Sequence, residues 1–280
     1  MALSPKPEKG SSSAFAECVF DMLTEIKGLV LRSCDIGEAD RLITVFSSEM
    51  GNLTAMVKGA RSLKNKNMSS TLQFCYSSFV LMKKGDKYWV KESSLIESFF
   101  NLRNTIEGLS LAGYIVEVLA DVTTATPEVD LLRLSLNSLY AISEGKHSLD
   151  KIKAAFEIRA MSIIGYMPDV LTCRSCEEKG GDFFFDIMSG NIECFNCHQK
   201  AVAQHKDKDV NPSEAKIIRI ISEGAKAALT YCINCPLERL LSFNLLPDDM
   251  DLFAKAVEDY LVNQLERTFK SLEFYKEVKP

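Results

Sequence analysis

Two pairs of cysteines have the type and spacing to hold a metal ion. Cys173 and Cys176 form one Cys-x-x-Cys pair, Cys194 and Cys197 form a second, and 17 residues separate the pairs. Two thiolates three residues apart on a tight turn can bind one metal without strain, and two such turns at the open end of a hairpin complete a tetrahedral set of sulfurs. This spacing is typical of zinc sites. We therefore expect one structural Zn²⁺ ion bound by these four cysteines, with no open position for a substrate.

Alternatives to this interpretation remain in the same part of the chain. Four free thiols in a reducing compartment are the simplest alternative to a metal site. His198 directly follows Cys197 and could replace it as a ligand, although the cysteine set is already complete. Cys232 and Cys235 form a third pair that has no second pair to join. We interpret these two as structural thiols at a helix end, because a redox role needs a thioredoxin-like βαβ context that is absent here.

A second group of residues that could do chemistry is basic. Between residues 58 and 91 the chain carries eight Lys or Arg residues and a single acidic residue, Asp86, whereas the whole chain has a net charge of −5. A basic segment within an acidic chain predicts an anionic partner at one face. The alternative is that these lysines only keep the turns soluble.

No motif in the sequence predicts catalysis. The phosphate-binding G-x-x-x-x-G-K-[ST], the dinucleotide-binding G-x-G-x-x-G after a strand, the H-E-x-x-H metal motif and the G-x-S-x-G nucleophile motif are all absent. The three histidines, His147, His198 and His205, lie in no pattern that suggests a general base. We expect no catalytic residue, no cofactor-binding residue and no enzymatic activity.

The elements that must position these groups begin with strands. Short runs rich in β-branched and aromatic residues, separated by turn signals, predict five strands before residue 100. Lys83–Lys87 has the composition of a hairpin tip. Five short strands without a long helix predict a small antiparallel barrel, for which the OB-fold is the natural candidate. The expected strands cover residues 26–32, 42–46, 53–57, 77–82 and 88–90, and residues 92–100 complete the last hairpin.

From residue 101 the spacing of apolar residues changes to three and four, which predicts helices. Three of them precede Gly165 and Pro168, which end the third. After the cysteine pairs, the segment 211–214 (NPSE) has an Asn cap, a Pro at the first helical position and a Glu three residues after the cap. We expect further helices over residues 211–229, 236–243 and 247–269.

Together these elements predict an α+β multidomain chain, in which an N-terminal OB-fold β-barrel precedes an α-helical domain with an inserted four-cysteine zinc finger. A length of 280 residues fits two or three domains. The absence of an export signal and of a membrane span, together with nine cysteines, an odd number, favours the cytoplasm. The expected parts are a flexible N-terminal extension (1–24), the OB-fold (25–100), the first part of the helical domain (101–168), the zinc finger (169–205) and its second part (206–280).

A series of short motifs in a fixed order resembles a known family. The motifs are GLVLR (28–32), IGEADRL (36–42), GNL (51–53), VKGAR (57–61), FEIR (156–159), GYMPD (165–169), the two cysteine pairs, PLERLLSF (236–243) and KSLEF (270–274). Over about residues 25–275 this order is similar to that of the RecO family of bacterial recombination mediators. The acidic balance and the N-terminal extension are departures from the family.

The resemblance implies a function in DNA repair and recombination. Family members bind single- and double-stranded DNA, anneal complementary strands, bind the acidic C-terminal tail of single-stranded-DNA-binding protein (SSB), and help load RecA together with RecR. The resemblance also implies that the protein is located in the bacterial cytoplasm and associates with the nucleoid. Cations near the family motifs would neutralise phosphates without reading bases, so that binding is salt-sensitive and independent of sequence. The candidate DNA contacts are Arg32, Arg41, Lys58, Arg61, Lys64, Lys66 and Lys84.

The main alternative function is a zinc-containing protein-interaction adaptor that does not anneal DNA. In that case the helical domain would bind an acidic peptide in an apolar groove, with Arg133 and Arg159 as possible rim residues. An enzyme with an unrecognised site is a third possibility. Among the barrel aromatics we expect Phe79 in the core, whereas the sequence leaves Trp89 open between core and surface.

Overall fold

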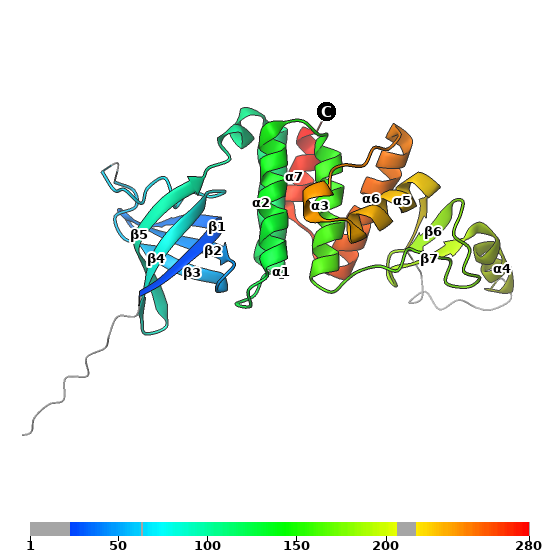
Figure 1. The fold of residues 1–280 in the computed structure, drawn as a ribbon, viewed down its shortest axis with the longest axis horizontal. Helices are drawn as coiled ribbons and strands as arrows, with labels where there is room; N and C mark the ends of the chain where they lie inside the picture. Colours follow the sequence, from blue (N-terminus) through cyan, green and yellow to red (C-terminus); the bar gives the residue numbers. More distant parts are fainter. Residues whose placement is uncertain (1–22, 63, 206–216, 280) are drawn as a thin grey trace, which may run out of the picture.

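The computed structural model describes residues 23–62, 64–205 and 217–279. In Figure 1 they form three parts in a row: a β-barrel, a group of helices, and a small sheet with one helix at the far end. The predicted order of barrel, helices and inserted module is confirmed. The predicted extension, residues 1–24, lies outside the described residues except for 23 and 24, with which the first strand begins.

Five strands form the closed barrel. They are β1 (Leu23–Ile36), β2 (Asp40–Ser47), β3 (Gly51–Val57), β4 (Tyr76–Lys84) and β5 (Lys87–Glu97). Their order around the barrel is β1-β2-β3-β5-β4, with β3 and β5 parallel and the other pairs antiparallel. This confirms the predicted OB-like barrel. The expected segments 88–90 and 92–100 differ from the observed structure, because most of both lies in one strand, β5, with a register irregularity between them.

The middle of the first strand, residues 28–31, is buried on both faces, which explains its apolar run. The side chain of Val30 belongs to the interior of the barrel together with that of Phe79. Leu29 and Leu31 belong instead to the core of the helical domain, as does Phe46 of β2. Alternate residues of a strand face opposite sides. The barrel and the helices therefore share one apolar contact zone.

The turn before β3 makes a second contact between the barrel and the helices. Gly51 has a φ of +63°, and a Cβ atom there would lie 2.5 Å from the carbonyl oxygen of Thr124. The backbone N–H of Asn52 donates to that oxygen at 2.7 Å, and its side-chain amide donates to Oγ1 of Thr123 at 2.9 Å. Only glycine fits this close approach, which holds the loop between the first two long helices against the barrel.

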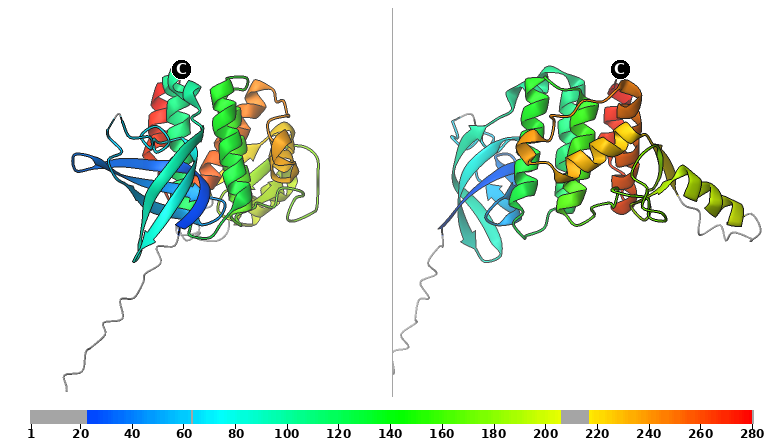
Figure 2. Two further views of the ribbon diagram at one scale, coloured as in Figure 1. Left: turned by 60° about the vertical axis from the view of Figure 1, so that its left-hand side comes forward. Right: turned by 45° about the vertical axis from the view of Figure 1, so that its right-hand side comes forward.

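Helices from both sides of the inserted module build the helical domain (Figure 2). They are η1 (Phe100–Asn104), α1 (Ile106–Val122), α2 (Val129–Glu144), α3 (Leu149–Ile163), α5 (Glu223–Asn234), η3 (Leu237–Arg239), α6 (Pro247–Gln264) and α7 (Lys270–Val278). α7 packs against α1, and α6 packs against α3. The carboxylate of Glu117 on α1 accepts hydrogen bonds from the backbone N–H and the hydroxyl of Ser271 at the start of α7. The last helices of the chain thus complete the bundle that the first three begin.

Ionisable side chains are buried together where α1, α3 and α6 meet. Nζ of Lys153 lies 2.8 Å from carboxylate oxygens of both Glu157 and Glu258. The hydroxyl of Tyr114 donates to Oε1 of Glu157 at 2.7 Å. Burial raises the pKa of Glu157, and the neighbouring lysine offsets this only in part. Burial also raises the pKa of Tyr114 well above its usual value.

The inserted module is a small sheet followed by one helix. Strands β6 (Phe183–Asp186) and β7 (Asn191–Cys194) form the predicted hairpin, and α4 (Phe195–His205) follows directly. A third strand, β8 (Ile218–Ile221), pairs with the other edge of β6, so the sheet order is β7-β6-β8. The sheet therefore joins chain segments from either side of α4.

We predicted one helix over residues 211–229, and this prediction is wrong for the described residues before Glu223. Residues 218–221 form strand β8, and α5 begins only at Glu223. The expected helix start at 211–214 lies outside the described residues. Three of the four residues of β8 are isoleucines, which favour a strand wherever an unpaired sheet edge is available. Pairing with β6 therefore determines the structure of residues 218–221, although the helix-start pattern at 211–214 predicted a helix there.

The last two predicted helices are present in shortened form. The expected helix 236–243 is reduced to the single turn η3, and the expected helix 247–269 ends at Gln264. Glu266, with a φ of 50°, turns the chain before α7 begins. No helix among the described residues is both long and apolar enough to cross a membrane.

Candidate metal centre and nucleic-acid interface

The four cysteines of the predicted pairs come together at one end of the inserted module. Cys173 and Cys176 lie in the loop between α3 and β6, Cys194 ends β7, and Cys197 lies in the first turn of α4. Their Sγ atoms all lie within 4.8 Å of one another. Those of Cys176 and Cys194 are 3.6 Å apart, close to the spacing of about 3.8 Å that follows from two Zn–S bonds of about 2.3 Å in a tetrahedron. The cluster therefore fits a single metal ion.

The hairpin of β6 and β7 sets the position of the second pair. Cys194 pairs in register with Phe183, so its sulfur lies at the open end of the hairpin. At the closed end, Oδ1 of Asp186 accepts the backbone N–H of Met188 at 3.0 Å. Gly190 supplies the left-handed conformation that the turn needs, with a φ of +70°. A short and well-defined turn thus fixes where the four sulfurs meet.

Backbone N–H groups surround the sulfur of Cys173. It accepts hydrogen bonds from the N–H of Cys194 at 3.3 Å and from that of Ser175 at 3.5 Å. Burial acts to raise the pKa of this thiol, but the N–H donors outweigh burial and lower the pKa to about 7. Hydrogen bonds with Cys176 and Cys194 instead raise the pKa of Cys197 to about 12. A metal ion binds the thiolate form of cysteine, and the lowered pKa of Cys173 favours that form.

His198 and the third cysteine pair lie outside the cluster. The ring of His198 stacks on that of Phe184 with 3.9 Å between centroids, and its Nδ1 lies 3.4 Å from a carboxylate oxygen of Glu193. Cys232 and Cys235 are buried at the end of α5. Burial raises the pKa of both thiols. Buried and hard to ionise, this pair fits the structural role that we predicted for it.

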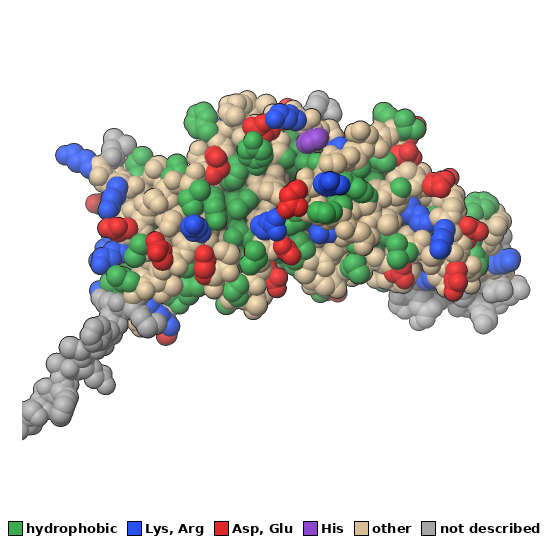
Figure 3. Space-filling model, in the orientation of Figure 1, with side chains coloured by type: hydrophobic (Ala, Val, Ile, Leu, Met, Phe, Trp, Pro, Cys, Tyr) green, Lys and Arg blue, Asp and Glu red, His purple; other side chains and the backbone are tan. Residues whose placement is uncertain are grey.

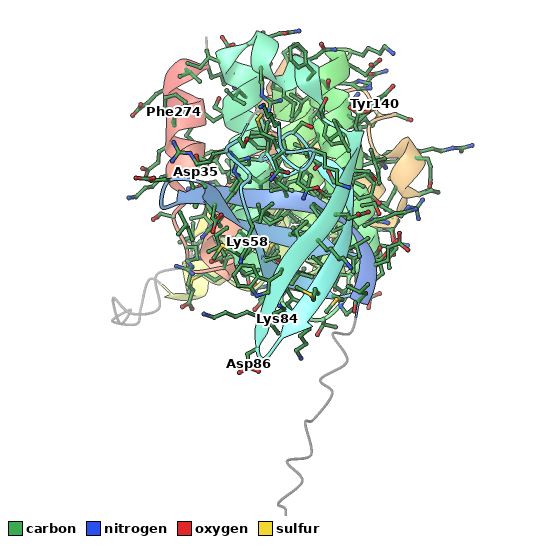
Figure 4. The ribbon with its side chains drawn as sticks, turned by 90° about the vertical axis from the view of Figure 1, so that its left-hand side faces the viewer. Asp35, Lys58, Lys84, Asp86, Tyr140 and Phe274 are labelled. Carbon is green, nitrogen blue, oxygen red and sulfur yellow. The ribbon has the colours of Figure 1, made fainter. Side chains whose placement is uncertain are left out.

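Four of the seven candidate DNA contacts are exposed on the barrel. Arg32, Lys58, Lys64 and Lys84 are exposed, and none of them forms an ion pair with a described carboxylate. Lys84 lies beside Asp86 at the tip of the β4–β5 hairpin, and Figure 4 shows Lys58 on the same side of the barrel, turned away from the helices. Figure 3 shows cationic side chains along this end of the molecule. The barrel therefore presents basic groups to the solvent.

The other three candidates contact neighbouring groups of the barrel. Arg41 is only 8% exposed, and its Nε lies 2.9 Å from Oδ1 of Asp35. Nε of Arg61 lies 3.5 Å from the same carboxylate. Lys66 pairs with Glu92 at 3.2 Å. Arg41 thus supports the end of the barrel, whereas Arg61 and Lys66 remain at its surface with a carboxylate partner each.

A basic groove beside α5 was not predicted from the sequence. It has a volume of about 690 Å³, and its lining includes the cations Lys179, Lys226 and Arg239 together with Leu171 and Tyr231. These residues come from the loops around the cysteine pairs, from α5 and from η3, so no local sequence pattern groups them. Of the three cations, Lys179 and Arg239 are exposed, whereas Lys226 is only 7% exposed and donates to the carbonyl oxygen of Lys179. The groove thus combines apolar side chains with two exposed cations, and the acidic Glu223 also lines it.

The two arginines that the sequence suggested for the rim of a peptide-binding groove are engaged elsewhere. Arg133 pairs with Glu238 and with Asp130, which lies three residues before it on α2. Arg159 donates to the carbonyl oxygen of Cys232 at 3.3 Å and to that of the next residue. It thereby places a positive charge at the C-terminal end of α5, which the helix dipole favours.

Comparisons with known proteins cover both the barrel and the helical domain. A family described as recombination protein O, N terminal, matches residues 22–99, and one described as recombination protein O, C terminal, matches residues 103–273. The DNA repair protein RecO of Acetivibrio thermocellus is 35% identical over 251 residues, which are 89% of this chain and 94% of that protein. The DNA repair protein RecO of Alkaliphilus metalliredigens is 28% identical over 260 residues, or 92% and 100% of the two chains. The chain therefore belongs to the RecO family of DNA repair proteins.

Proposed function

We propose that this protein is a DNA-binding recombination mediator without catalytic activity of its own. In this role it binds single- and double-stranded DNA, anneals complementary strands, acts on strands coated by SSB, and helps load RecA together with RecR. Its place is the bacterial cytoplasm, at the nucleoid. The observation that supports the DNA-binding part is the set of exposed cations on the barrel, of which Lys58 and Lys84 lie on the side turned away from the helices (Figure 4).

The chemistry of these cations suits annealing. Arg32, Lys58, Lys64 and Lys84 would neutralise phosphates and leave the base edges free to pair. Arg61 and Lys66 can also bind phosphates, because DNA can replace their exposed carboxylate partners. Such surface ion pairs contribute only about 0–1 kcal/mol. For Arg41 we propose an indirect role: its Nη1 donates to the carbonyl oxygen of Met68 at 3.3 Å and so shapes the loop that carries the other cations.

Annealing of two complementary labelled strands tests this function. The strands are used bare and coated with SSB, without nucleotide, at two salt concentrations. We expect the protein to accelerate annealing on both substrates and the acceleration to weaken as salt rises, since the binding is electrostatic. No acceleration and no DNA binding at low salt would contradict the proposal and favour the adaptor function.

We further propose that Cys173, Cys176, Cys194 and Cys197 bind one structural Zn²⁺ ion. Four sulfurs leave no open coordination position, so the ion would stabilise the module and take no part in a reaction. The bound ion would link the loop before β6 to the end of β7 and the start of α4. The strands β6 and β7 are short, so the ion would add a connection that the sheet alone does not provide. In such small modules the site forms only when the chain folds, so the free energy of zinc binding adds directly to the free energy of folding.

Metal analysis of the purified protein tests the zinc proposal. We expect one zinc ion per chain, and none after Cys173→Ser and Cys176→Ser, with faster proteolysis within the module. Cys34→Ser is a matched control, because Cys34 is an exposed cysteine outside the cluster. Zinc-free native protein, or a full zinc content in the double variant, would refute the assignment.

The groove beside α5 is the observation that favours a protein partner as well. The exposed cations Lys179 and Arg239 beside apolar lining residues offer the chemistry that an acidic, partly apolar peptide needs, and we propose the SSB tail as its ligand. An adaptor that binds only proteins would need this groove but not the barrel cations. Arg239→Glu, at an exposed residue of the lining, should therefore reduce annealing on SSB-coated strands and leave annealing on bare strands unchanged. Equal loss on both substrates would count against a tail-binding groove.

A further inference from the structure

A row of apolar side chains crosses the outer surface of the barrel at one level. The strand register places Leu23 opposite Met82, Met82 opposite Trp89, Trp89 opposite Met56, and Met56 opposite Leu42. Alternate residues of a strand face opposite sides, and the neighbours of the row along four of the strands belong to the barrel core. These core neighbours are Ile43, Ala55, Val57, Leu81 and Val90. The side chains of the row therefore point outward.

The row is only partly covered by other groups. Leu23 is 51% exposed, the other four side chains are partly exposed, and none belongs to either apolar core of the described residues. The solvent side of an antiparallel sheet is ordinarily polar. A continuous apolar strip on such a surface indicates a binding site.

Cations border this row. Nζ of Lys58, directly after β3, lies 5.1 Å from the centroid of the Trp89 ring. Lys87 lies two positions before Trp89 on β5, and Lys84 lies two positions after Met82 on β4, so each shares the face of its neighbour. All three lysines are exposed and form no ion pair with a described carboxylate. An apolar strip bordered by cations fits an anionic ligand that also has flat apolar faces.

We propose that Trp89 stacks on a base of single-stranded DNA, between Met56 and Met82, while the bordering lysines contact the phosphates. The inference rests on the proposed DNA-binding function and adds the face and the residue that hold the base. A single strand exposes the faces of its bases, whereas a duplex hides them within its own stack. Stacking on an aromatic side chain is tolerant of sequence, as a strand-annealing protein requires.

Lys58 covers the indole ring until DNA binds. The cation–π contact keeps the ammonium over the ring in the free protein. A base that stacks on this face displaces the ammonium, which is then free to pair with a phosphate of the same strand. Because the base is held by its face, its Watson–Crick edge stays open to a complementary strand.

The fluorescence of the full-length protein tests the stacking, because Trp89 is the only tryptophan in the chain. The ligands are an oligothymidylate of about 16 nucleotides, the upper end of OB-fold site sizes, and an abasic deoxyribose-phosphate strand of equal length. Binding is measured separately by the anisotropy of a label on each strand. We expect the oligothymidylate to quench the tryptophan emission and the abasic strand to bind without quenching.

Substitutions give a second test of the same site. Trp89→Ala should lower the affinity for oligothymidylate roughly five- to 150-fold, as expected for one lost stacked base, and leave the affinity for the abasic strand unchanged. Trp89→Phe should retain most of the affinity, and circular dichroism checks that each variant is folded. Phe274→Ala is the matched control, since Phe274 is an exposed aromatic on α7, away from the row (Figure 4); it should change neither affinity.

The outcomes separate this inference from the proposed function. Tight binding of oligothymidylate without quenching, and with equal affinity in Trp89→Ala, would overturn the stacking and leave the DNA-binding function intact. No binding of any strand at low salt would overturn the DNA-binding function itself. Quenching by an acidic peptide but not by DNA would overturn the inference in favour of a protein partner at this row.

Discussion

At the scale of single residues, the cysteine loop contains a backbone conformation that its side chain disfavours. Glu177 directly follows Cys176 and has a φ of 61°, in the left-handed region that glycine adopts without penalty. The N–H of Glu177 donates to the carbonyl oxygen of Cys173 at 2.9 Å. The turn that brings the first two sulfurs together therefore imposes this conformation.

Glu177→Gly should stabilise the module. Relief of about 1–2 kcal/mol of left-handed strain exceeds the about 0.5–1 kcal/mol of chain entropy that glycine loses on folding. We expect slower loss of zinc to a chelator. Glu266→Gly is the control, because Glu266 has a φ of 50° beyond α6 and should stabilise the helical domain without changing zinc retention. Faster zinc loss in Glu177→Gly would show that the carboxylate matters more than the strain.

A second prediction at this scale concerns alkaline pH. Burial raises the pKa of Tyr260 to about 12 from an ordinary value of 10.0, so the folded protein holds this proton more tightly than the unfolded chain. The contribution of Tyr260 to stability is present below pH 10 and is lost as the pH rises towards 12. Urea unfolding between pH 9 and about 12 should show a shallower fall for Tyr260→Phe than for the native protein. Equal slopes would contradict the shift.

The residues of the candidate sites could be predicted from the sequence to different degrees. The four clustered cysteines follow from spacing alone, because Cys-x-x-Cys turns are local and a hairpin supplies the rest. Arg41 was chosen for its place in a family motif, but it alternates with Ile43 and Val45, whose side chains are buried in the barrel. That alternation could have shown that Arg41 faces inward. The groove cations have no sequence signal, because three separate segments supply them.

At the scale of elements, the buried charge cluster joins helices that are far apart in the chain. Lys153→Met should destabilise the protein by about 3–5 kcal/mol, because it leaves the buried carboxylate of Glu157 without a cation. Glu258 keeps its ion pair with Lys276 at 2.5 Å. Lys255→Met is the control on α6: its side chain is 58% exposed, pairs with Asp259 at 2.9 Å and lies 3.9 Å from Glu258, so the loss should be about 0–1 kcal/mol. Chemical denaturation measures both. Similar values would mean that Glu157 becomes protonated at little cost when the lysine is removed.

The elements themselves were predictable wherever the cue was local. Apolar runs between turn signals predicted the barrel strands, and three- and four-residue spacing predicted α1 to α3. β8 was missed because its strand character depends on the free edge of β6, which a linear sequence does not display. The apolar row across the barrel was missed for the same reason, since only the register brings Met56, Met82 and Trp89 to one level.

At the scale of the whole molecule, the proposed DNA-binding face and the inserted module lie at opposite ends (Figure 1). Lys84→Gln should therefore lower the affinity for single-stranded DNA and reduce the slope of log affinity against log salt by about 0.7, the value for one phosphate contact. Lys200→Gln on α4 is the control, because Lys200 is an equally exposed lysine at the other end. The same slope change in both variants would argue against a DNA face confined to the barrel.

The contact between α1 and α7 has a consequence for the synthesis of the protein. The ring of Phe269, just before α7, packs edge-on against Tyr114 of α1 at 5.7 Å, so the bundle closes only after nearly the entire chain has left the ribosome. At about 5–20 residues per second, that is roughly 8–30 s after α1 has been translated. Until then the side of α1 that α7 covers, including Tyr114, stays open to solvent. During that interval the uncovered apolar surface of α1 makes the nascent chain prone to aggregation.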